Sequence, residues 1–402
     1  MHAQELIIMA HVPTESVNDG FLPAARSLGL LPVLITDQAE AHRQHFGQSG
    51  LQAYPEAIIS CDVFNPLAVI EAISRRRQKP VAVFSNSDHL QTSTAIVAEY
   101  YQLPGKPWEV AYRAKNKAEM RTFFQQQGIE TLRHAVAFEL ESLVKASAYV
   151  GYPCVIKPRE GVASQNVCLA QDYHQLYVHC LAVWQSHPGL AMLIEEYLEG
   201  PLYTLETLGD GETLSAIGGF QVHLSAPPHF VELAASWQHD VTGHEEILAQ
   251  IRRFGIGFGA CHSEFVLTAN GPRLIEINYR CIGDRRDFLL GQVWGINLFA
   301  EVLQLHLGAP VPTFALASRT AVIRYLTPTN AGRVRLAPDA FSCHVGSTEV
   351  GLHVLRKVGD EIAITHSNKD YLGILTCVGT DATHVQHMLS QAGNELSWEI
   401  GV

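Results

Sequence analysis

Two carboxylates and one amide flank a turn near residue 270: Glu264, Glu276 and Asn278. A hairpin loop centred on Asn270 would pair Glu264 with Glu276, and strand alternation with period two puts Asn278 on the face of Glu276. Carboxylates opposed on neighbouring strands repel each other, whereas carboxylate and amide oxygens suit a Mg²⁺ ion that keeps waters and phosphate oxygens. We therefore expect a magnesium site on this hairpin. A solvated sheet face with unrelated partners is the alternative that the residues leave open.

Two further cations are candidates for contacts with phosphate. Arg280 follows Asn278 by two residues, where a guanidinium can clamp a transferring phosphoryl group. A surface arginine paired with a carboxylate is the alternative. Lys117 lies near the start of a predicted helix over residues 116–127 and, taken alone, is typical of a solvated lysine.

A third cation ends an apolar run. Lys157 closes the run 154–157 and precedes a loop over residues 159–166. A lysine at a strand end can place a point charge on a phosphate, and small loop residues such as Gly161 and Ser164 let backbone N–H groups approach its oxygens. The loop is not a Walker A sequence, so alone it is a weak indication of phosphate binding.

Alternating strands and helices must position these side chains, which indicates an α/β protein. The N-terminal hundred residues predict a parallel sheet, with strands over 6–10, 31–35, 57–60 and 81–84 and helices over 21–28, 66–76 and 91–101. Further on we expect helices over 140–150, 173–184, 298–307 and 383–392, strands over 154–157 and 192–196, and a hairpin over 261–268 and 273–278. After about residue 200, and again from residue 319, mostly strands are expected. Residues 10–15 lack a G-x-G-x-x-G fingerprint, which disfavours a dinucleotide-dependent oxidoreductase.

Composition excludes several classes of protein. The 402 residues are 47% hydrophobic and 17% charged, so the chain can bury a core and is not disordered. A net charge of −12 disfavours binding to nucleic acid through a general positive field. The apolar runs are too short to span a bilayer, and the N-terminal residues do not resemble a signal peptide. We expect a cytoplasmic protein whose eight scattered cysteines are reduced, without structural zinc.

Four segments, in this order, resemble motifs of the ATP-grasp superfamily of carboxylate–amine ligases. They are residues 115–129, residues 151–158, residues 193–200, and residues 262–264 with 274–280. The resemblance runs from about residue 107 to 308. It implies an ATP-grasp fold with a Rossmann-like parallel-sheet domain (1–106), a small α+β subdomain with the phosphate loop (107–199), a central α+β subdomain with the metal site (200–310) and a mostly β lid (311–402).

The resemblance also implies roles for individual residues. Lys117 and Lys157 would hold the ATP phosphates, and the loop with Gly161 and Ser164 would close over them. Arg280 would stabilise the acyl-phosphate transition state. The adenine would be lined by Glu195, Glu196, Tyr197 and Leu198. Since Leu202 stands where many relatives have a glutamate, Glu199 or Glu206 would contact the ribose. Mg²⁺, or Mn²⁺ in its place, would be held by Glu264, Glu276 and Asn278.

Two segments resemble particular branches of the superfamily. Residues 227–232 are similar to the substrate segment of the L-amino-acid ligases, which implies that Glu232 faces a substrate amine. Residues 278–284, with Gly283 in the substrate pocket, resemble ATP-grasp proteins of siderophore pathways that join an amino acid to a small polycarboxylate.

The predicted activity is ATP-dependent joining of a small carboxylate to an amine, with ADP and phosphate as products. Bicarbonate activation as in biotin carboxylases, and nucleotide binding without turnover, remain as alternatives. The identity of both substrates and the choice between monomer and homodimer stay open.

Overall fold

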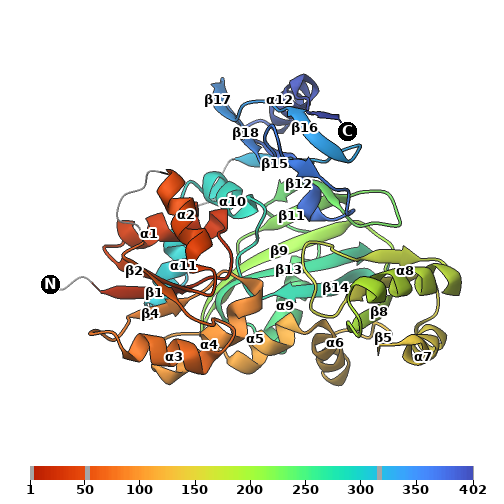
Figure 1. The fold of residues 1–402 in the computed structure, drawn as a ribbon, viewed down its shortest axis with the longest axis horizontal. Helices are drawn as coiled ribbons and strands as arrows, with labels where there is room; N and C mark the ends of the chain where they lie inside the picture. The colour runs from red at the N-terminus through yellow and green to blue at the C-terminus, as the bar shows by residue number, and fades with distance from the viewer. Residues whose placement is uncertain (1–3, 50–54, 315–318, 402) are drawn as a thin grey trace.

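The computed structural model describes residues 4–49, 55–314 and 319–401. In Figure 1 an N-terminal α/β unit lies at the left, a small sheet with two helices at the right, and a long central sheet between them. The C-terminal lobe stands on top of the central sheet (Figure 1). All four parts border one cavity.

The N-terminal unit is a four-stranded parallel sheet in the order β3-β2-β1-β4. Its strands are β1 (Glu5–Met9), β2 (Leu31–Thr36), β3 (Ala57–Ser60) and β4 (Ala82–Phe84). Its helices are the π-helix η1 (Ser16–Phe21), α1 (Leu22–Ser27), α2 (Ala39–Ser49), α3 (Pro66–Ser74), the 3-10 helix η2 (Asp88–Leu90) and α4 (Gln91–Tyr100). The predicted parallel sheet is confirmed. Ile7 and Ile8 are both fully buried, as expected when helices cover both faces.

Two helices connect this unit to the next. They are α5 (Trp108–Lys115) and α6 (Lys117–Gln126). The side chain of Asn116 accepts a hydrogen bond from the Glu119 N–H and so caps α6, as is common for asparagine at a helix start. Helix α5 begins directly after Pro107 and was not predicted.

The small subdomain is an antiparallel sheet in the order β5-β8-β6-β7. Its elements are β5 (His134–Ala137), α7 (Leu140–Val150), β6 (Cys154–Pro158), β7 (Cys168–Ala170), α8 (Tyr173–Ser186) and β8 (Met192–Glu196). Apolar residues of α7 and α8 form one buried cluster with the sheet.

The central subdomain and the lid share one ten-stranded sheet, along which the order is β14-β13-β9-β11-β12-β15-β20-β18-β17, with β10 beside β9. The central elements are β9 (Leu202–Asp210), β10 (Leu214–Ala216), β11 (Gly219–Leu224), β12 (Glu232–Gln238), α9 (His244–Phe254), β13 (Phe258–Thr268), β14 (Gly271–Asn278), α10 (Arg286–Trp294) and α11 (Leu298–His306). Helix α11 packs against the N-terminal unit, where the rings of Phe21 and Phe299 lie 4.9 Å apart.

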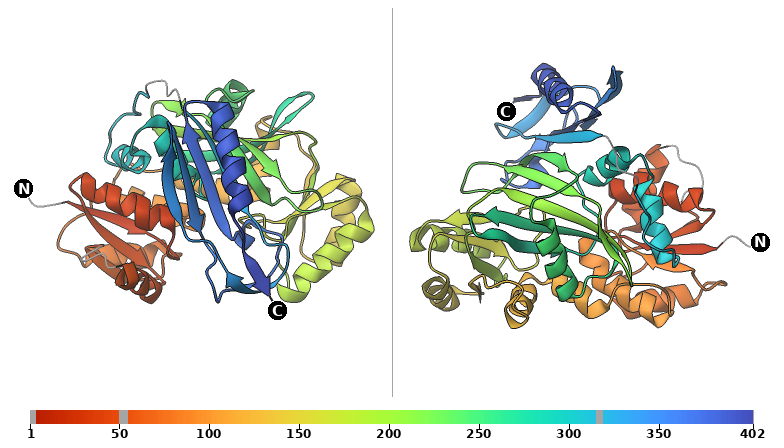
Figure 2. Two further views of the ribbon diagram at one scale, coloured as in Figure 1. Left: turned by 90° about the horizontal axis from the view of Figure 1, so that it is seen from above. Right: turned by 180° about the vertical axis from the view of Figure 1, so that it is seen from behind.

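The lid continues the central sheet through the antiparallel pairing of β12 with β15. Its elements are β15 (Thr320–Leu326), β16 (Gly332–Leu336), β17 (Phe341–Val345), β18 (Thr348–Val354), β19 (Glu361–Ile362), the 3-10 helix η3 (Asn368–Asp370), β20 (Gly373–Gly379), α12 (Ala382–Glu395) and β21 (Glu399–Gly401). Figure 2 shows α12 and the lid strands above the central sheet, and α9 against its far side.

Two further expectations concern cysteines and membrane spans. All eight cysteines are free, as predicted, and six of them are buried. Among the described residues no single helix has the length and apolar character needed to cross a bilayer, and α10 with α11 meets that criterion only as a pair bent by 98°.

Candidate active site

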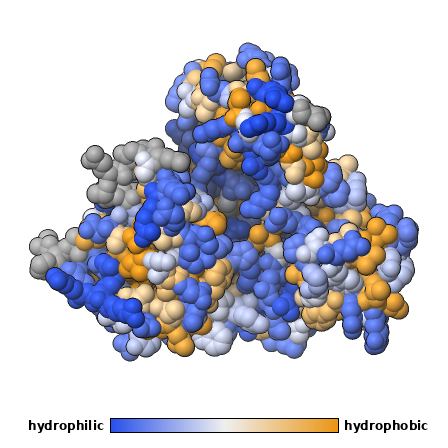
Figure 3. All heavy atoms as spheres, in the orientation of Figure 1, coloured by the Kyte–Doolittle hydropathy of each residue, from blue (hydrophilic) through white to orange (hydrophobic). Residues whose placement is uncertain are grey.

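A cavity of about 630 Å³ lies where the N-terminal unit, the two subdomains and the lid meet. Seen from the side of Figure 1, the surface is hollowed below the C-terminal lobe, and hydrophilic residues border the recess (Figure 3). The predicted site residues that line the cavity are Lys117, Lys157, Gly161, Ser164, Glu195, Glu196, Tyr197, Leu198, Glu232, Glu264, Glu276, Asn278, Arg280 and Gly283. Glu206 is not among the lining residues.

The β13–β14 hairpin opposes two carboxylates, because Glu264 pairs with Glu276 as predicted. The turn differs from the predicted one: Thr268 pairs with Gly271 across a two-residue loop, so a regular ladder would set Glu264 opposite Ile275. A β-bulge leaves Ile275 without an opposite residue and shifts the register by one. The bulge is therefore what brings the two acids together.

Each of these acids has a cationic partner. The Glu276 Oε1 lies 3.0 Å from the Lys117 Nζ, and the Glu264 Oε1 lies 3.2 Å from the His262 Nε2. The other ring nitrogen of His262 is 2.8 Å from the Glu206 Oε1. Burial opposes ionisation, but His262 outweighs it and lowers the pKa of Glu264 to about 2, while Glu206 and Glu264 raise the pKa of His262 to about 9. Glu206, on the neighbouring strand β9, thus holds the His262 ring in place beside Glu264.

The donors on this hairpin fit Mg²⁺. Asn278 is 7% exposed, lines the cavity, and its side-chain amide makes no hydrogen bond with the described residues. In the described parts of the chain no three His, Cys, Asp or Glu side chains are grouped to hold a metal ion. The hairpin offers two carboxylates and one amide oxygen, and Mg²⁺ commonly completes such a set with water and phosphate oxygens.

Helix α6 presents Lys117 at its first position. The Lys117 Nζ donates a hydrogen bond of 2.7 Å to the Gly161 carbonyl, in addition to its ion pair with Glu276. Burial lowers the pKa of this lysine, but Glu276 outweighs burial and raises it above its ordinary value. Lys117 is therefore charged and joins the loop over residues 159–166 to the β13–β14 hairpin.

Lys157 is held by a glutamate of the neighbouring strand. On β6 and β8, Val155 pairs with Glu195, so Lys157 and Glu195 lie diagonally on one face, with Nζ and Oε2 2.6 Å apart. The Arg121 Nε donates to the other Glu195 oxygen at 2.5 Å. These two cations outweigh burial and hold the pKa of Glu195 at about 2. The Glu195 carboxylate therefore positions Lys157. Contacts with a base are left to the backbone of the hinge, residues 196–198.

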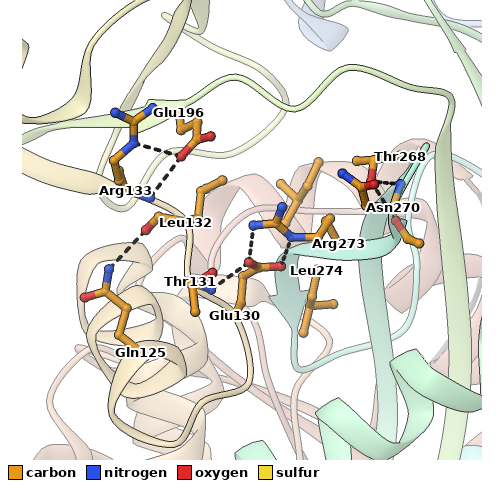
Figure 4. Close-up of polar contacts among 12 residues, drawn as sticks. Gln125, Glu130, Thr131, Leu132, Arg133, Glu196, Thr268, Asn270, Arg273 and Leu274 are labelled. Carbon is orange, nitrogen blue, oxygen red and sulfur yellow. Dashed lines mark hydrogen bonds and ion pairs between the residues drawn. The ribbon is translucent and has the colours of Figure 1, made fainter.

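The hinge after β8 retains a free backbone donor. The N–H of Glu196 donates to the Arg133 carbonyl and that of Tyr197 to the Pro153 carbonyl, whereas the Leu198 N–H makes no backbone hydrogen bond with described residues. The side chains of Arg133 and Glu196 also pair at 3.1 Å (Figure 4). Leu198 can thus donate to the edge of an adenine.

The segment before β5 is also fixed to the β13–β14 hairpin. The Arg273 Nε donates to the Glu130 Oε2 at 2.7 Å, and a second nitrogen of Arg273 contacts the other carboxylate oxygen (Figure 4). Glu130 is 5% exposed. This two-point contact connects the segment before β5 to β14. The Arg133–Glu196 pair connects the same segment to the hinge, so the hinge and the hairpin are held at a fixed position relative to each other.

The loop over residues 159–166, which the resemblance predicts to bind phosphate, adopts a left-handed backbone at non-glycine positions. Ala163, Ser164 and Asn166 have φ of 55°, 54° and 57°, which is unfavourable for residues with a Cβ. The lid contacts the loop here, because the Asn368 N–H donates to the Ala163 carbonyl at 3.0 Å. The loop is thus held over the cavity by the lid.

Arg280 is oriented by the N-terminal unit. Its Nε lies 3.8 Å from Asp88 and its Nη1 donates to the Cys281 carbonyl at 2.8 Å. Asp88 is also 2.5 Å from the Lys115 Nζ. Asp88 follows the carboxyl end of β4, where ligand sites of parallel sheets form. This position after a predicted strand is the signal by which the sequence could have indicated Asp88 as a site residue.

Glu232 and Arg286 form a buried pair at the end of the cavity bordered by the lid. The Glu232 Oε2 is 2.7 Å from the Arg286 Nη2, and the Asn368 side chain donates to the Glu232 Oε1 at 3.4 Å. Burial raises the pKa of Glu232, and Arg286 opposes that rise. The lining residues that sequence reasoning did not single out include Asp88, His262, Arg286, Asn368 and Lys369.

Several known proteins are similar to this chain in sequence. The "Uncharacterized protein y4rH" of Sinorhizobium fredii is 25% identical over 332 residues, which are 79% of this chain and 68% of that protein. Carnosine synthase 1 of Gallus gallus is 27% identical over 368 residues, or 84% of this chain, which thus spans 38% of the synthase. No protein-family profile matches the chain.

Among solved structures, the L-amino acid ligase of Bacillus licheniformis is similar with a TM-score of 0.77 at 18% identity, over 99% of each chain. At this identity the likeness shows the fold. The chain has the ATP-grasp fold, as the four sequence motifs predict.

Proposed function

We propose that this ATP-grasp protein is an ATP- and Mg²⁺-dependent ligase that activates a small carboxylate as an acyl phosphate and joins it to an amine. The observation that carries the proposal is that Lys117, Lys157, Arg280 and the opposed acids Glu264 and Glu276 line one cavity. Phosphoryl transfer requires positioning and charge neutralisation more than covalent help from the protein. These side chains supply both.

The nucleotide would lie between the hinge and the metal hairpin. Backbone groups of Tyr197 and Leu198 would meet the adenine, and Lys117 and Lys157 would bind the phosphates beneath the loop over residues 159–166. Glu264, Glu276 and Asn278 would together hold Mg²⁺, or Mn²⁺ in its place. When bound, this ion neutralises charge on the β- and γ-phosphates.

The reaction has two displacements. An oxygen of the substrate carboxylate attacks the γ-phosphorus, the bond to ADP breaks, and an acyl phosphate forms with Arg280 beside the transferred group. The neutral amine then attacks the acyl carbon, phosphate leaves, and the nitrogen loses a proton. The loop and the lid exclude water, which would otherwise hydrolyse the acyl phosphate.

The substrates that this site would take are small molecules. The resemblance of residues 227–232 to the L-amino-acid ligases implies that Glu232 binds an ammonium group, so an amino acid is the expected partner in the ligation, with another amino acid or a small polycarboxylate as the second. The resemblance of residues 278–284 to ATP-grasp proteins of siderophore pathways favours a pathway of that type, and we expect the protein to act in the cytoplasm.

Product analysis tests the proposal. The protein, ATP and Mg²⁺ are incubated with paired carboxylates and amines, and nucleotides are separated by chromatography. We expect ADP, phosphate and an amide that depends on both substrates. ADP formation that requires bicarbonate alone would favour the biotin-carboxylase-like alternative, and nucleotide binding without ADP release across the panel would favour a non-catalytic protein.

A further inference from the structure

Two arginines of this protein are equally inaccessible but differ in how they are bonded. Arg121 and Arg286 are 1% and 3% exposed. Arg121 uses every guanidinium nitrogen, donating to Glu195 and to the carbonyls of Leu274 and Ile275. It is the pattern expected of a structural arginine, because buried donors are nearly always satisfied.

Arg286 leaves part of its guanidinium unbonded. Its Nη2 lies 2.7 Å from Glu232, but Nε and Nη1 are buried without a hydrogen-bond partner among the described residues. Leaving donors of a buried charged group unpaired is unfavourable. The fold therefore holds a cation with hydrogen-bonding capacity that its own residues do not use.

The position of Arg286 explains what could use that capacity. It is the first residue of α10 and lines the cavity together with Arg280 and Gly283. The rings of Phe220 and Tyr325 lie 5.9 and 6.0 Å from its guanidinium carbon, which fixes the group at this place. The unbonded donors thus belong to a side chain of the cavity wall.

The unbonded guanidinium donors favour an anionic ligand group. Glu232 offsets part of the Arg286 charge through an ion pair at 2.7 Å, its Oε1 accepts a hydrogen bond from Asn368, and its Oε2 has no hydrogen-bond partner among the described residues. Lys369, next to Asn368 on the lid, lines the cavity as a further cation. Guanidinium donors match the oxygens of a carboxylate in charge and geometry. Arg280 lies against Asp88 of the N-terminal unit, whereas Arg286 lies against Glu232 beside the lid, so this carboxylate would be a different group from the one that is activated.

We propose that the acid substrate is a dicarboxylic acid, with one carboxylate bound by Arg286 while the other is activated beside Arg280. This inference rests on the proposed ligase function and specifies its substrate class. Both carboxylates would be bound by side chains that line the cavity, Arg280 and Arg286.

Matched substrate pairs test the proposal on the wild-type protein. Succinate and succinamate, aspartate and asparagine, and glutamate and glutamine differ in one carboxylate that is replaced by an amide of similar shape. With hydroxylamine as the amine, ADP and hydroxamate are measured for each acid. We expect at least one diacid to exceed its monoamide by a hundredfold or more in kcat/KM. Equal kcat/KM values within every active pair would overturn the proposal, and absence of ADP with every acid would overturn the proposed function itself.

Arg286→Gln then tests the residue. For the active diacid we expect kcat/KM to fall at least a hundredfold, while the monoamide changes less than threefold and KM for ATP less than twofold. Equal losses for diacid and monoamide, or a matching rise in KM for ATP, would remove Arg286 from this role. Arg285→Gln is the matched control, because Arg285 pairs with Glu15 and is not a lining residue. If Arg286→Gln does not fold, as judged by its melting curve, the substrate pairs decide the proposal alone.

Discussion

The ammonium of Lys117 lies 3.0 Å from the Oε1 of Glu276, so the first residue of α6 is paired with an acid of the β13–β14 hairpin. The same ammonium donates to the Gly161 carbonyl. The pairing offsets the repulsion between Glu276 and the opposed Glu264. Nucleotide binding would replace this pair by contacts of Lys117 with phosphate and of Glu276 with Mg²⁺.

Glu276→Gln should reduce Mg²⁺-dependent turnover by roughly a hundredfold, since it removes one anionic oxygen from the site of charge neutralisation. Turnover is measured as ADP release over a range of Mg²⁺ concentrations. Glu212→Gln, an exposed substitution of the same kind, is the control and should leave turnover unchanged. Near wild-type turnover of Glu276→Gln at saturating Mg²⁺ would show that the hairpin does not hold the metal.

Asp88→Asn should lower kcat about tenfold or more and leave KM for ATP nearly unchanged, because Asp88 orients Arg280 rather than contacting the nucleotide. Asp88→Glu should restore part of kcat. Asp240, whose side chain is 85% exposed, provides the control variant Asp240→Asn. A large rise in KM for ATP in Asp88→Asn, without loss of kcat, would contradict this positioning role.

Glu232→Gln should raise KM for the ammonium-bearing substrate by more than tenfold, because loss of one partner of a desolvated charge pair costs about 2–5 kcal/mol. Glutamine keeps the size of the side chain. Steady-state kinetics with each substrate varied in turn provides the measurement. An equal rise in KM for ATP would move Glu232 out of the substrate pocket.

Asp287 should make the protein less stable as the pH rises from about 4 to 6. Burial raises the pKa of this carboxyl to about 6, against the opposing hydrogen bond from Ser16. A folded state with the higher pKa binds more protons than the unfolded state between the two pKa values, so stability falls by about 1.4 kcal/mol per pH unit there. Above about pH 6 the loss is complete, at roughly 3 kcal/mol.

Asp287→Asn removes this titration. Urea unfolding of both proteins at pH 4, 5, 6 and 7 should show the free energy of unfolding of the wild type falling relative to that of the variant. Parallel pH profiles of the two proteins would mean that Asp287 is ionised with an ordinary pKa in the folded state.

Local sequence patterns were sufficient to predict much of the fold, and their failures have local causes too. Helix α9 was missed within a region expected to be strands, although Ile247, Ile251 and Phe254 have helical spacing and are buried. Helix α5 has no counterpart among the expected helices, although it begins directly after Pro107 and proline is common at helix starts. The continuity of the lid with the central sheet depends on pairing of β12 with β15, a long-range contact that no local pattern encodes.

In the candidate site, too, some features follow from local sequence patterns and others depend on the tertiary structure. The opposed Glu264 and Glu276 were predicted from a symmetric loop, but a bulge at Ile275 produces the pair. Arg286 could not be singled out because its importance lies in donors left unbonded after folding, which only the assembled cavity reveals. Charged residues that act through distant partners require the tertiary structure.

Oxygen transfer from the acid to phosphate tests the central claim most directly. The protein is supplied with ATP, Mg²⁺, an amine and the acid substrate labelled with ¹⁸O in its carboxylates, and the released phosphate is analysed by mass spectrometry. An acyl-phosphate intermediate predicts one ¹⁸O atom in the phosphate, with ADP as the nucleotide product, because the attacking carboxylate oxygen leaves with phosphorus. Unlabelled phosphate, or AMP and pyrophosphate as products, would contradict the account.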